Sequence, residues 1–336
     1  MSVSARKGGR EADLYMLYKV ACYYYQDGLL QDEISAIEQI SRSQISRYLS
    51  QARELGIVRV SVSLPQAPDC LALEKRLEGK LGLRRVVVSP CASNREAARR
   101  RAIAASAAIY LLDALEGAHI IGFGWGRTIY DTSLQLPYSK HTRNALYVPL
   151  IGVSGVNDAA FQINTIIDRI AERRKGQGYF LALPTFRQKL IPMAGIDNTR
   201  VQKLKDYWKV LDAAVFGLGT VRQSDRFMNE EVQPLYSQRV RNSKAEGEIL
   251  SQFFFEDGRL LDYGEEDLIQ LAFDLNDLAR VPTTICLAGG NEKVNGIIQG
   301  ARLGFFKHLV TDSFTAQAID QRLGEGKNDE SLDVSW

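Results

Sequence analysis

The pattern of apolar positions changes character at residues 65–68. Before that point apolar residues recur every three or four positions, which is typical of short helices. After it, short apolar runs alternate with longer amphipathic stretches, which indicates strands separated by helices. Pro65 and Pro68 interrupt both helix and strand. We therefore predict a linker at 65–68 between a domain at 1–64 and a domain at 69–336.

The first domain is predicted to be small and all-α, with a strand at its end. A first helix is indicated by the apolar stripe of Leu14, Leu17, Tyr18, Ala21 and Tyr25. A second, short helix is expected at 31–38. A third, at 43–55, has a buried stripe of Ile45, Tyr48, Leu49 and Ala52. Gly56 is the expected C-cap, and alternation over 58–62 predicts a wing or edge strand.

The third predicted helix carries a polar face opposite its apolar stripe. Gln44, Arg47 and Gln51 share this face. Arginine pairs bidentately with guanine, and glutamine does the same with adenine, in the major groove of DNA. The alternative is an ordinary helical hairpin with a solvated polar face.

Two further features of this helix bear on that choice. Ser41 and Ser43 are good N-cap residues, and Arg42 beside them suits a phosphate oxygen at the helix N-terminus. Four arginines against one glutamate within 41–59 give a local charge of +3. This balance favours a polyanionic partner.

The second domain is predicted to be α/β with a mainly parallel sheet. Strands are expected at 85–89, 119–123, 146–151, 179–183, 213–217, 283–288 and 308–311. Helices are expected between them at 95–115, 161–175, 200–211, 264–279 and 291–303. Leu73, Leu77 and Leu81 mark one more helix after the linker. Its stripe either packs on its own domain or helps subunits associate.

Composition narrows the class of protein. The chain has 336 residues, of which 45% are hydrophobic and 24% charged, as in a globular protein of two domains. The net charge of +2 means that any nucleic-acid binding is local. The cluster of arginines at 95–101 is interpreted as a solvated helix start, with a second nucleic-acid patch as the alternative.

The remaining residue counts argue against metals and membranes. Cys22, Cys70, Cys91 and Cys286 are widely scattered, so we expect small buried residues rather than a metal site or a disulfide framework. No signal peptide is recognisable, and the longest apolar stretch, at 102–112, is too short to span a bilayer. We expect a cytoplasmic protein without cofactor or metal.

Three predicted strands of the second domain end in glycine-rich turns. At the carboxyl end of a strand, glycines let the backbone approach an anion closely. The turns are Gly122-Phe123-Gly124-Trp125-Gly126-Arg127-Thr128, Gly217-Leu218-Gly219-Thr220 and Leu287-Ala288-Gly289-Gly290-Asn291-Glu292-Lys293. The first is neither a dinucleotide-binding nor a Walker A motif. The first turn is either a phosphate cradle or an ordinary tight turn. In the third, Lys293 either reaches a phosphate or sugar oxygen or is a solvated lysine.

The segment at 18–60 resembles the N-terminal domain of SorC-family bacterial transcriptional regulators, which implies a winged helix-turn-helix DNA-binding domain at 1–64. Matching positions include Gly28, Gln31, Ser41, Arg42, Ser46, Arg47, Ala52, Arg53 and Gly56. The candidate DNA-binding residues are Gln31, Ser41, Arg42, Ser43, Gln44, Ser46, Arg47 and Gln51. Two positions depart from the family pattern, because Glu38 stands where leucine is usual and Gln39 where the turn usually has glycine. We expect Ile37 to supply the apolar contact that Glu38 cannot.

The resemblance continues through the second domain, in the order GFGWGRT, GLGT, GEILSQFF, LAGGNEKVNGI and LVTDSFTA. The SorC-type sugar-binding domain resembles phosphosugar isomerases and deaminases. The resemblance implies an effector site at Gly124, Trp125, Gly126, Arg127, Thr128, Gly219, Thr220, Gly289, Gly290 and Lys293. Phe255 stands where the family commonly has aspartate, so either Glu256 or Asp257 takes its place or the effector is less hydroxylated.

Two functions follow as hypotheses. The first is a regulator that binds double-stranded operator DNA as a dimer or tetramer and senses a sugar or sugar phosphate. The second is a phosphosugar isomerase or deaminase with a DNA-binding appendage. Such chemistry needs a general base. His119, His141 and His308 all lie outside the glycine-rich turns, and helix capping explains Asp312 as well as catalysis does. We therefore favour the regulator and predict no catalytic residues.

Overall fold

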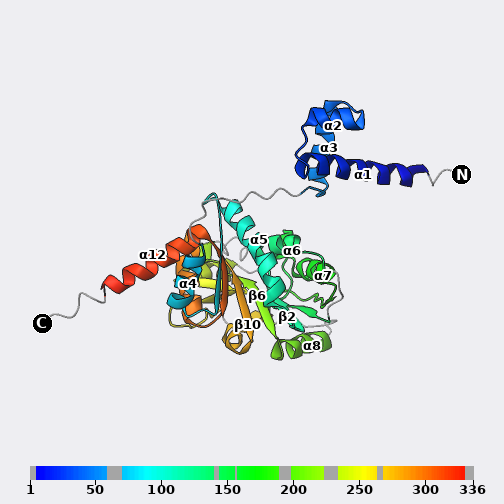
Figure 1. The fold of residues 1–336 in the computed structure, drawn as a ribbon. Helices are drawn as coiled ribbons and strands as arrows, with labels where there is room; N and C mark the ends of the chain where they lie inside the picture. Colours follow the sequence, from blue (N-terminus) through cyan, green and yellow to red (C-terminus); the bar gives the residue numbers. More distant parts are fainter. Residues whose placement is uncertain are drawn as a thin grey trace. The chain divides into compact units, whose positions relative to one another are not determined.

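The computed structural model describes residues 5–58, 70–139, 144–155, 157–188, 198–222, 234–262 and 268–329 (Figure 1). The chain forms two compact units, Met1–Pro65 and Gln66–Trp336. The predicted linker at 65–68 and the predicted strand beyond Val58 lie outside the described residues.

The first unit contains three helices, α1 (Ala5–Tyr25), α2 (Gln31–Glu38) and α3 (Arg42–Glu54). Ser41 caps α3, because its side chain accepts a hydrogen bond from the backbone N–H of Gln44 at 3.3 Å. Gly56 follows α3 with a φ of +71°, as expected for a glycine that ends a helix. The core consists of Leu17, Val20, Ala21, Ile34, Ile45, Leu49 and Ala52.

The predicted stripe of α1 is only partly correct. Leu17 and Ala21 are buried, but Leu14, Tyr18 and Tyr25 are exposed. Nearly every position from 14 to 25 is apolar or aromatic, so periodicity could not identify the buried face. Packing against α2 and α3 determines which face of α1 is buried.

The turn between α2 and α3 accommodates both departures from the family pattern. Gln39 adopts the left-handed conformation, with a φ of 57° and a ψ of 34°. Ile37 is 52% exposed, so the expectation that it replaces the missing leucine was wrong. Glu38 instead turns toward α1, where its carboxylate lies 2.8 Å from the Lys19 ammonium. An ion pair therefore occupies the place of an apolar contact.

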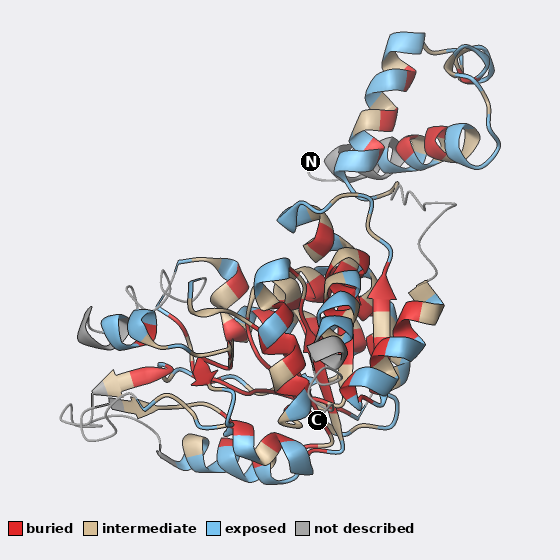
Figure 2. Cartoon of the chain, turned by 90° about the vertical axis from the view of Figure 1, so that its left-hand side faces the viewer, coloured by how far each residue is buried: buried red, intermediate tan, exposed pale blue. Residues whose placement is uncertain are grey.

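The second unit is built on a seven-stranded sheet in the order β1-β11-β10-β6-β2-β3-β4, with every neighbouring pair parallel. The strands are β1 (Arg85–Ser89), β2 (Ile120–Phe123), β3 (Leu146–Pro149), β4 (Gln177–Gly178), β6 (Ala213–Gly217), β10 (Thr283–Leu287) and β11 (His308–Asp312). Figure 2 shows the strands buried among helices whose outer faces are exposed. The predicted α/β class with a parallel sheet is confirmed.

The helices around this sheet are α4 (Cys70–Leu81), α5 (Glu96–Ala114), α6 (Arg127–Gln135), α7 (Ile163–Arg174), α8 (Asn198–Lys209), α10 (Pro234–Asn242), α11 (Val294–Arg302) and α12 (Ser313–Asp329). Leu73, Leu77 and Leu81 of α4 are buried within their own unit, against β1 and α12. This stripe is therefore not available for subunit association. Of the four cysteines, Cys286 is buried and the other three are only partly so.

Two of the secondary-structure predictions for this unit were wrong. The strand expected at 179–183 is instead the shorter β4, which ends at Gly178. Most of the helix expected at 264–279 is replaced by β9 (Leu268–Gln270) and the 3-10 helix η2 (Leu275–Arg280), while 263–267 lie outside the described residues. β9 pairs with β5 (Phe186–Gln188), about 80 positions earlier in the chain. Local periodicity cannot detect so distant a partner.

The motif GEILSQFF forms a small antiparallel hairpin of β7 (Gly247–Ile249) and β8 (Gln252–Phe254). Its two central residues, Leu250 and Ser251, both have positive φ, at 52° and 59°. Residues other than glycine, asparagine and aspartate rarely adopt this conformation. Side-chain packing holds the turn, since Leu250 and Ser251 are both buried.

Candidate functional site

A cavity of about 940 Å³ lies at the carboxyl edge of the sheet. Parallel strands end at the same edge, so the segments after β2, β6 and β10 converge there with the first turns of α5 and α6. The charged side chains that line the cavity are those of Glu96, Arg99, Arg100, Arg127, Asp158, Arg222, Glu248, Glu292 and Lys293. The apolar part of the wall includes Ile103, Trp125, Phe161, Leu218 and Leu250.

Seven of the ten predicted effector-binding residues line this cavity: Trp125, Gly126, Arg127, Thr128, Gly219, Gly289 and Lys293. Gly124, Thr220 and Gly290 do not. A Cβ at position 124 would lie 2.7 Å from Cδ2 of Leu250, so a larger residue there would displace the buried Leu250 side chain. Gly290 has a φ of +128°, which the turn itself requires. Gly124 and Gly290 therefore shape the backbone of the site without lining the cavity.

The first turn of α6 faces the cavity. Gly126 precedes the helix with a φ of 124°, and Arg127 and Thr128 are its first two residues. The first N–H groups of a helix have no partner within the helix and carry partial positive charge. An anion in the cavity would meet these groups together with the Arg127 side chain.

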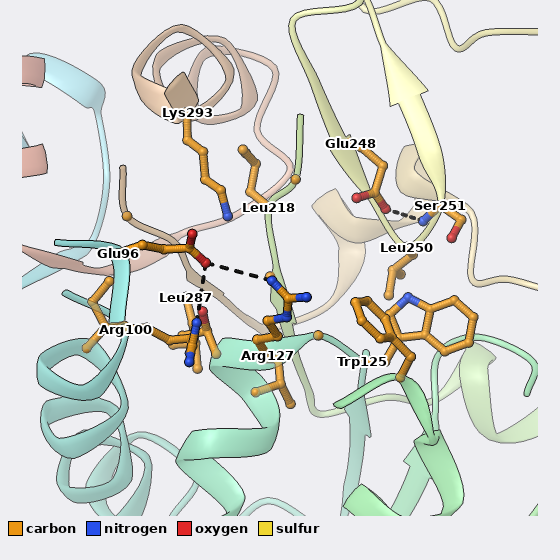
Figure 3. Close-up of a pocket in the computed structure, with 18 of the residues that line it drawn as sticks. Glu96, Arg100, Trp125, Arg127, Leu218, Glu248, Leu250, Ser251, Leu287 and Lys293 are labelled. Carbon is orange, nitrogen blue, oxygen red and sulfur yellow. Dashed lines mark hydrogen bonds and ion pairs between the residues drawn. The ribbon is translucent and has the colours of Figure 1, made fainter. Parts of the chain in front are cut away.

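Charged side chains from α5, α6 and η3 (Asn291–Lys293) face one another across the cavity (Figure 3). The Glu96 carboxylate lies 3.3 Å from Nη1 of Arg100 and 3.9 Å from Nη1 of Arg127. Arg100 also donates a hydrogen bond to Asp131 at 2.7 Å. Lys293 extends toward the same group from the opposite side. Its burial lowers the pKa of the ammonium below the ordinary lysine value, against the raising effect of nearby carboxylates such as Glu292.

The arginine cluster at 95–101 is not the solvated helix start that we expected. Arg95 and Arg101 are exposed, but Arg99 is buried and Arg100 partly buried, and both line the cavity. Arg99 donates to Oδ1 of Asn94 at 2.5 Å, and its Nε lies 3.9 Å from Asp312. The signal that could have placed them in the site was a group of four arginines at the start of the helix that follows the first strand, since such helix starts lie at the carboxyl edge of a parallel sheet.

Asp312 acts as a helix cap behind the cavity. Its Oδ1 accepts hydrogen bonds from the backbone N–H groups of Phe314 and Thr315, both at 3.0 Å. Its Oδ2 accepts one from the hydroxyl of Thr315 at 2.6 Å. The carboxylate is fully buried and does not line the cavity, so capping explains it.

The β7–β8 hairpin supplies the opposite wall. Glu248, Leu250 and Ser251 line the cavity, and the Glu248 carboxylate accepts a hydrogen bond from the backbone N–H of Ser251. Phe255 and the acids after it do not line it, so neither Glu256 nor Asp257 takes the place of the family's aspartate there. Glu248 was not among the predicted site residues, although it lies in the GEILSQFF motif.

In the first unit, the polar face of α3 is accessible. Arg47 and Gln51 are exposed and Gln44 is half-buried, while Ile45, Leu49 and Ala52 on the other face are buried. Ser46 is exposed and Gln31 half-buried. Arg42, at the start of α3, forms an exposed ion pair with Asp32 at 3.4 Å. Ser43 lies beside the capping residue, with its hydroxyl 2.9 Å from that of Ser41.

Comparison with known proteins identifies the larger unit. Residues 66–319 match the family model described as "Putative sugar-binding domain". The chain belongs to this family. It is 28% identical to the sorbitol operon regulator of Klebsiella pneumoniae over 315 residues, covering 91% of this chain and 98% of that protein. It is 29% identical to the deoxyribonucleoside regulator of Bacillus subtilis (strain 168) over 314 residues, covering 90% and 96%.

The fold agrees with these relatives. The crystal structure of the full-length sorbitol operon regulator SorC from Klebsiella pneumoniae aligns with a TM-score of 0.67 at 27% identity, over 92% of this chain and 99% of that one. The similarity covers both units, so the resemblance to SorC-family regulators is confirmed for nearly the whole chain.

Other features of the described residues bear on the remaining expectations. No helix in the described ranges has the length and apolar character needed to cross a membrane. In the same part of the chain, no three histidine, cysteine or acidic side chains converge as metal ligands would. His119 and His308 do not line the cavity, and His141 lies outside the described residues.

Proposed function

We propose that this protein is a transcriptional regulator of a sugar-utilisation operon whose DNA binding is controlled by a phosphorylated sugar. It acts in the cytoplasm, binds operator DNA through α3, and binds the effector in the cavity of the larger unit. Two of its relatives are named as a sorbitol operon regulator and a deoxyribonucleoside regulator, and most of its length matches theirs.

The observation that carries the effector assignment is the cationic end of the cavity. Arg127, Lys293 and the first turn of α6 all face one region. A phosphate group carries two negative charges and several acceptor oxygens, so it complements two cationic side chains and unpaired N–H groups. The apolar wall at Trp125 and Leu218, and the acid Glu248 beyond it, suit the carbon skeleton and hydroxyls of a sugar.

DNA binding is assigned to the polar face of α3. Gln44, Arg47 and Gln51 share that face of a helix capped at Ser41. One helix reads only a few base pairs, so specific binding requires a homo-oligomer, dimer or tetramer, on a repeated half-site. The effector changes DNA binding if the oligomer has two arrangements and the effector binds one of them more tightly than the other.

The test begins with a thermal-shift screen of the full-length protein against sugar phosphates and their unphosphorylated parents. A ligand that binds the folded state raises the melting temperature by mass action. Duplexes are then selected from a random-sequence library, and binding is measured by fluorescence anisotropy with and without that ligand.

Thr128→Val and Lys293→Ala are expected to retain duplex binding and to lose the response to the ligand. Lys209→Ala, an exposed lysine on α8, is the matched control and should respond as wild type does. A normal response in both cavity variants would show that the effector site is elsewhere.

A further inference from the structure

Glu96 places a negative charge where the proposed effector brings its own. It is the first residue of α5, and its carboxylate lies between Arg100 and Arg127, at 3.3 and 3.9 Å (Figure 3). Both arginines and Lys293 line the cavity. A carboxylate among three cations resembles a bound anion in charge and in the donors it engages.

We propose that Glu96 is an internal competitor for the phosphate of the effector, so that it sets the affinity and the charge selectivity of the cavity. The proposal rests on the function proposed above and adds a residue that limits binding. When a phosphate reaches Arg127, the Glu96 carboxylate gives up that side chain and turns outward.

The two arginines differ in how firmly they are held. Arg100 is also fixed by Asp131, to which its Nε donates at 2.7 Å, so it keeps its position when Glu96 leaves. Arg127 is half exposed and meets Glu96 at the longer distance of 3.9 Å. Arg127 is therefore the cation that Glu96 releases to a ligand.

Glu96 is placed so that it can leave the cavity at low cost. Its side chain is 61% exposed, so rotation about its own bonds returns the carboxylate to water. At the start of α5 it also remains near the positive end of the helix in either position. Glu96 consequently competes weakly enough for a phosphate to displace it, and strongly enough for the cavity to discriminate between charged and neutral ligands. A dianion displaces the carboxylate, whereas a neutral sugar has no charge with which to do so.

The test uses isothermal titration of the full-length chain with sulfate and with inorganic phosphate, as anions that lack any sugar hydroxyl. Glu96→Gln removes the charge and keeps the shape. Because exposed ion pairs contribute little each, we expect this variant to bind both anions about three- to tenfold more tightly than wild type. Glu96→Asp keeps the charge but shortens the reach toward Arg127, so its affinity for each anion should fall between those of wild type and Glu96→Gln.

Glu116→Gln removes an exposed acid from the turn after α5 and should bind as wild type does. Equal or weaker anion binding by Glu96→Gln, with both variants unfolding as wild type does, would overturn the competitor role and leave the phosphate site standing. Failure of every protein, wild type included, to bind either anion would overturn both the phosphate site and the role of Glu96.

Discussion

Thr315 joins Asp312 to the turn that follows β10. Its hydroxyl donates to Oδ2 of Asp312 at 2.6 Å and accepts from the backbone N–H of Gly290 at 2.7 Å. Both side chains are buried. The end of β11 and the Gly289-Gly290 turn, which leads to Lys293, are thus held together by one hydroxyl.

Replacing this hydroxyl tests the arrangement. Thr315→Val keeps the shape but leaves the Gly290 N–H without its acceptor and one Asp312 oxygen without its donor. We expect a loss of about 1–3 kcal/mol of unfolding free energy, since buried polar groups lose their partners. Denaturant unfolding measures it. Thr283→Val, at the half-buried start of β10, is the control and should change stability by less than about 0.5 kcal/mol. Equal effects of both variants would contradict the role of Thr315.

Arg47 tests the DNA-binding assignment. Arg47→Ala removes an exposed side chain from the polar face of α3 without touching its buried stripe. We expect affinity for the selected duplex to fall roughly ten- to a hundredfold, as for loss of a bidentate base contact, while effector binding stays unchanged. Fluorescence anisotropy measures binding to the duplex, and thermal shift measures binding of the effector. Arg322→Ala, exposed on α12, serves as the control. Full duplex affinity in Arg47→Ala would refute the assignment.

Lys293 makes anion binding depend on pH. Burial lowers the pKa of its ammonium, so the free protein loses this charge at a lower pH than an ordinary lysine would. An anion favours the charged form, so binding takes up a proton and affinity falls as the pH rises through this lowered pKa. Sulfate affinity should therefore already decline at pH values below about 10.4, the ordinary pKa of lysine, where an ordinary lysine would still be charged.

Lys293→Arg distinguishes that cause from a general effect of pH. Its guanidinium remains charged throughout this range, so its sulfate affinity should stay nearly constant where that of the wild type declines. Isothermal titration at several pH values measures both proteins. Parallel declines in the two would exclude Lys293 as the titrating group.

Asp320 links α12 to α4 in a pH-dependent way. Burial alone would raise the pKa of its carboxyl, but hydrogen bonds from Lys80 at 2.7 Å and Arg76 at 3.1 Å outweigh burial and lower it. A lowered pKa in the folded state means that the pairs stabilise the protein above the unfolded value of about 3.9 and that this is lost as pH falls further.

Asp320→Asn should therefore lower the unfolding free energy by about 0.5–1 kcal/mol at pH 7, with a difference from wild type that shrinks below pH 4. Denaturant unfolding at pH 7 and at pH 3 measures this difference. Asp113→Asn, an exposed acid near the end of α5, should show no such dependence. A difference that persists unchanged at pH 3 would mean that the charge of Asp320 is not responsible.

Sequence alone determined the features that depend on neighbouring residues. The buried stripe of α3 and its cap at Ser41 follow from helical periodicity and from a hydroxyl before the first turn. The strands β1 and β6 were predicted with their observed bounds, because each is a short apolar run beside a turn signal. Glycines at strand ends marked the edge of the sheet where the cavity lies.

Tertiary structure decided whatever depends on partners distant in the chain. Arg99 looked solvated, but packing buries it beside Asp312, and Glu248 reaches the cavity only because β7 and β8 form a strained hairpin. β9 exists because β5 pairs with it, and Glu38 replaces an apolar residue because Lys19 on α1 meets it. A side chain's own neighbours set its local conformation, whereas its burial and charge partners depend on which distant segments the fold brings beside it.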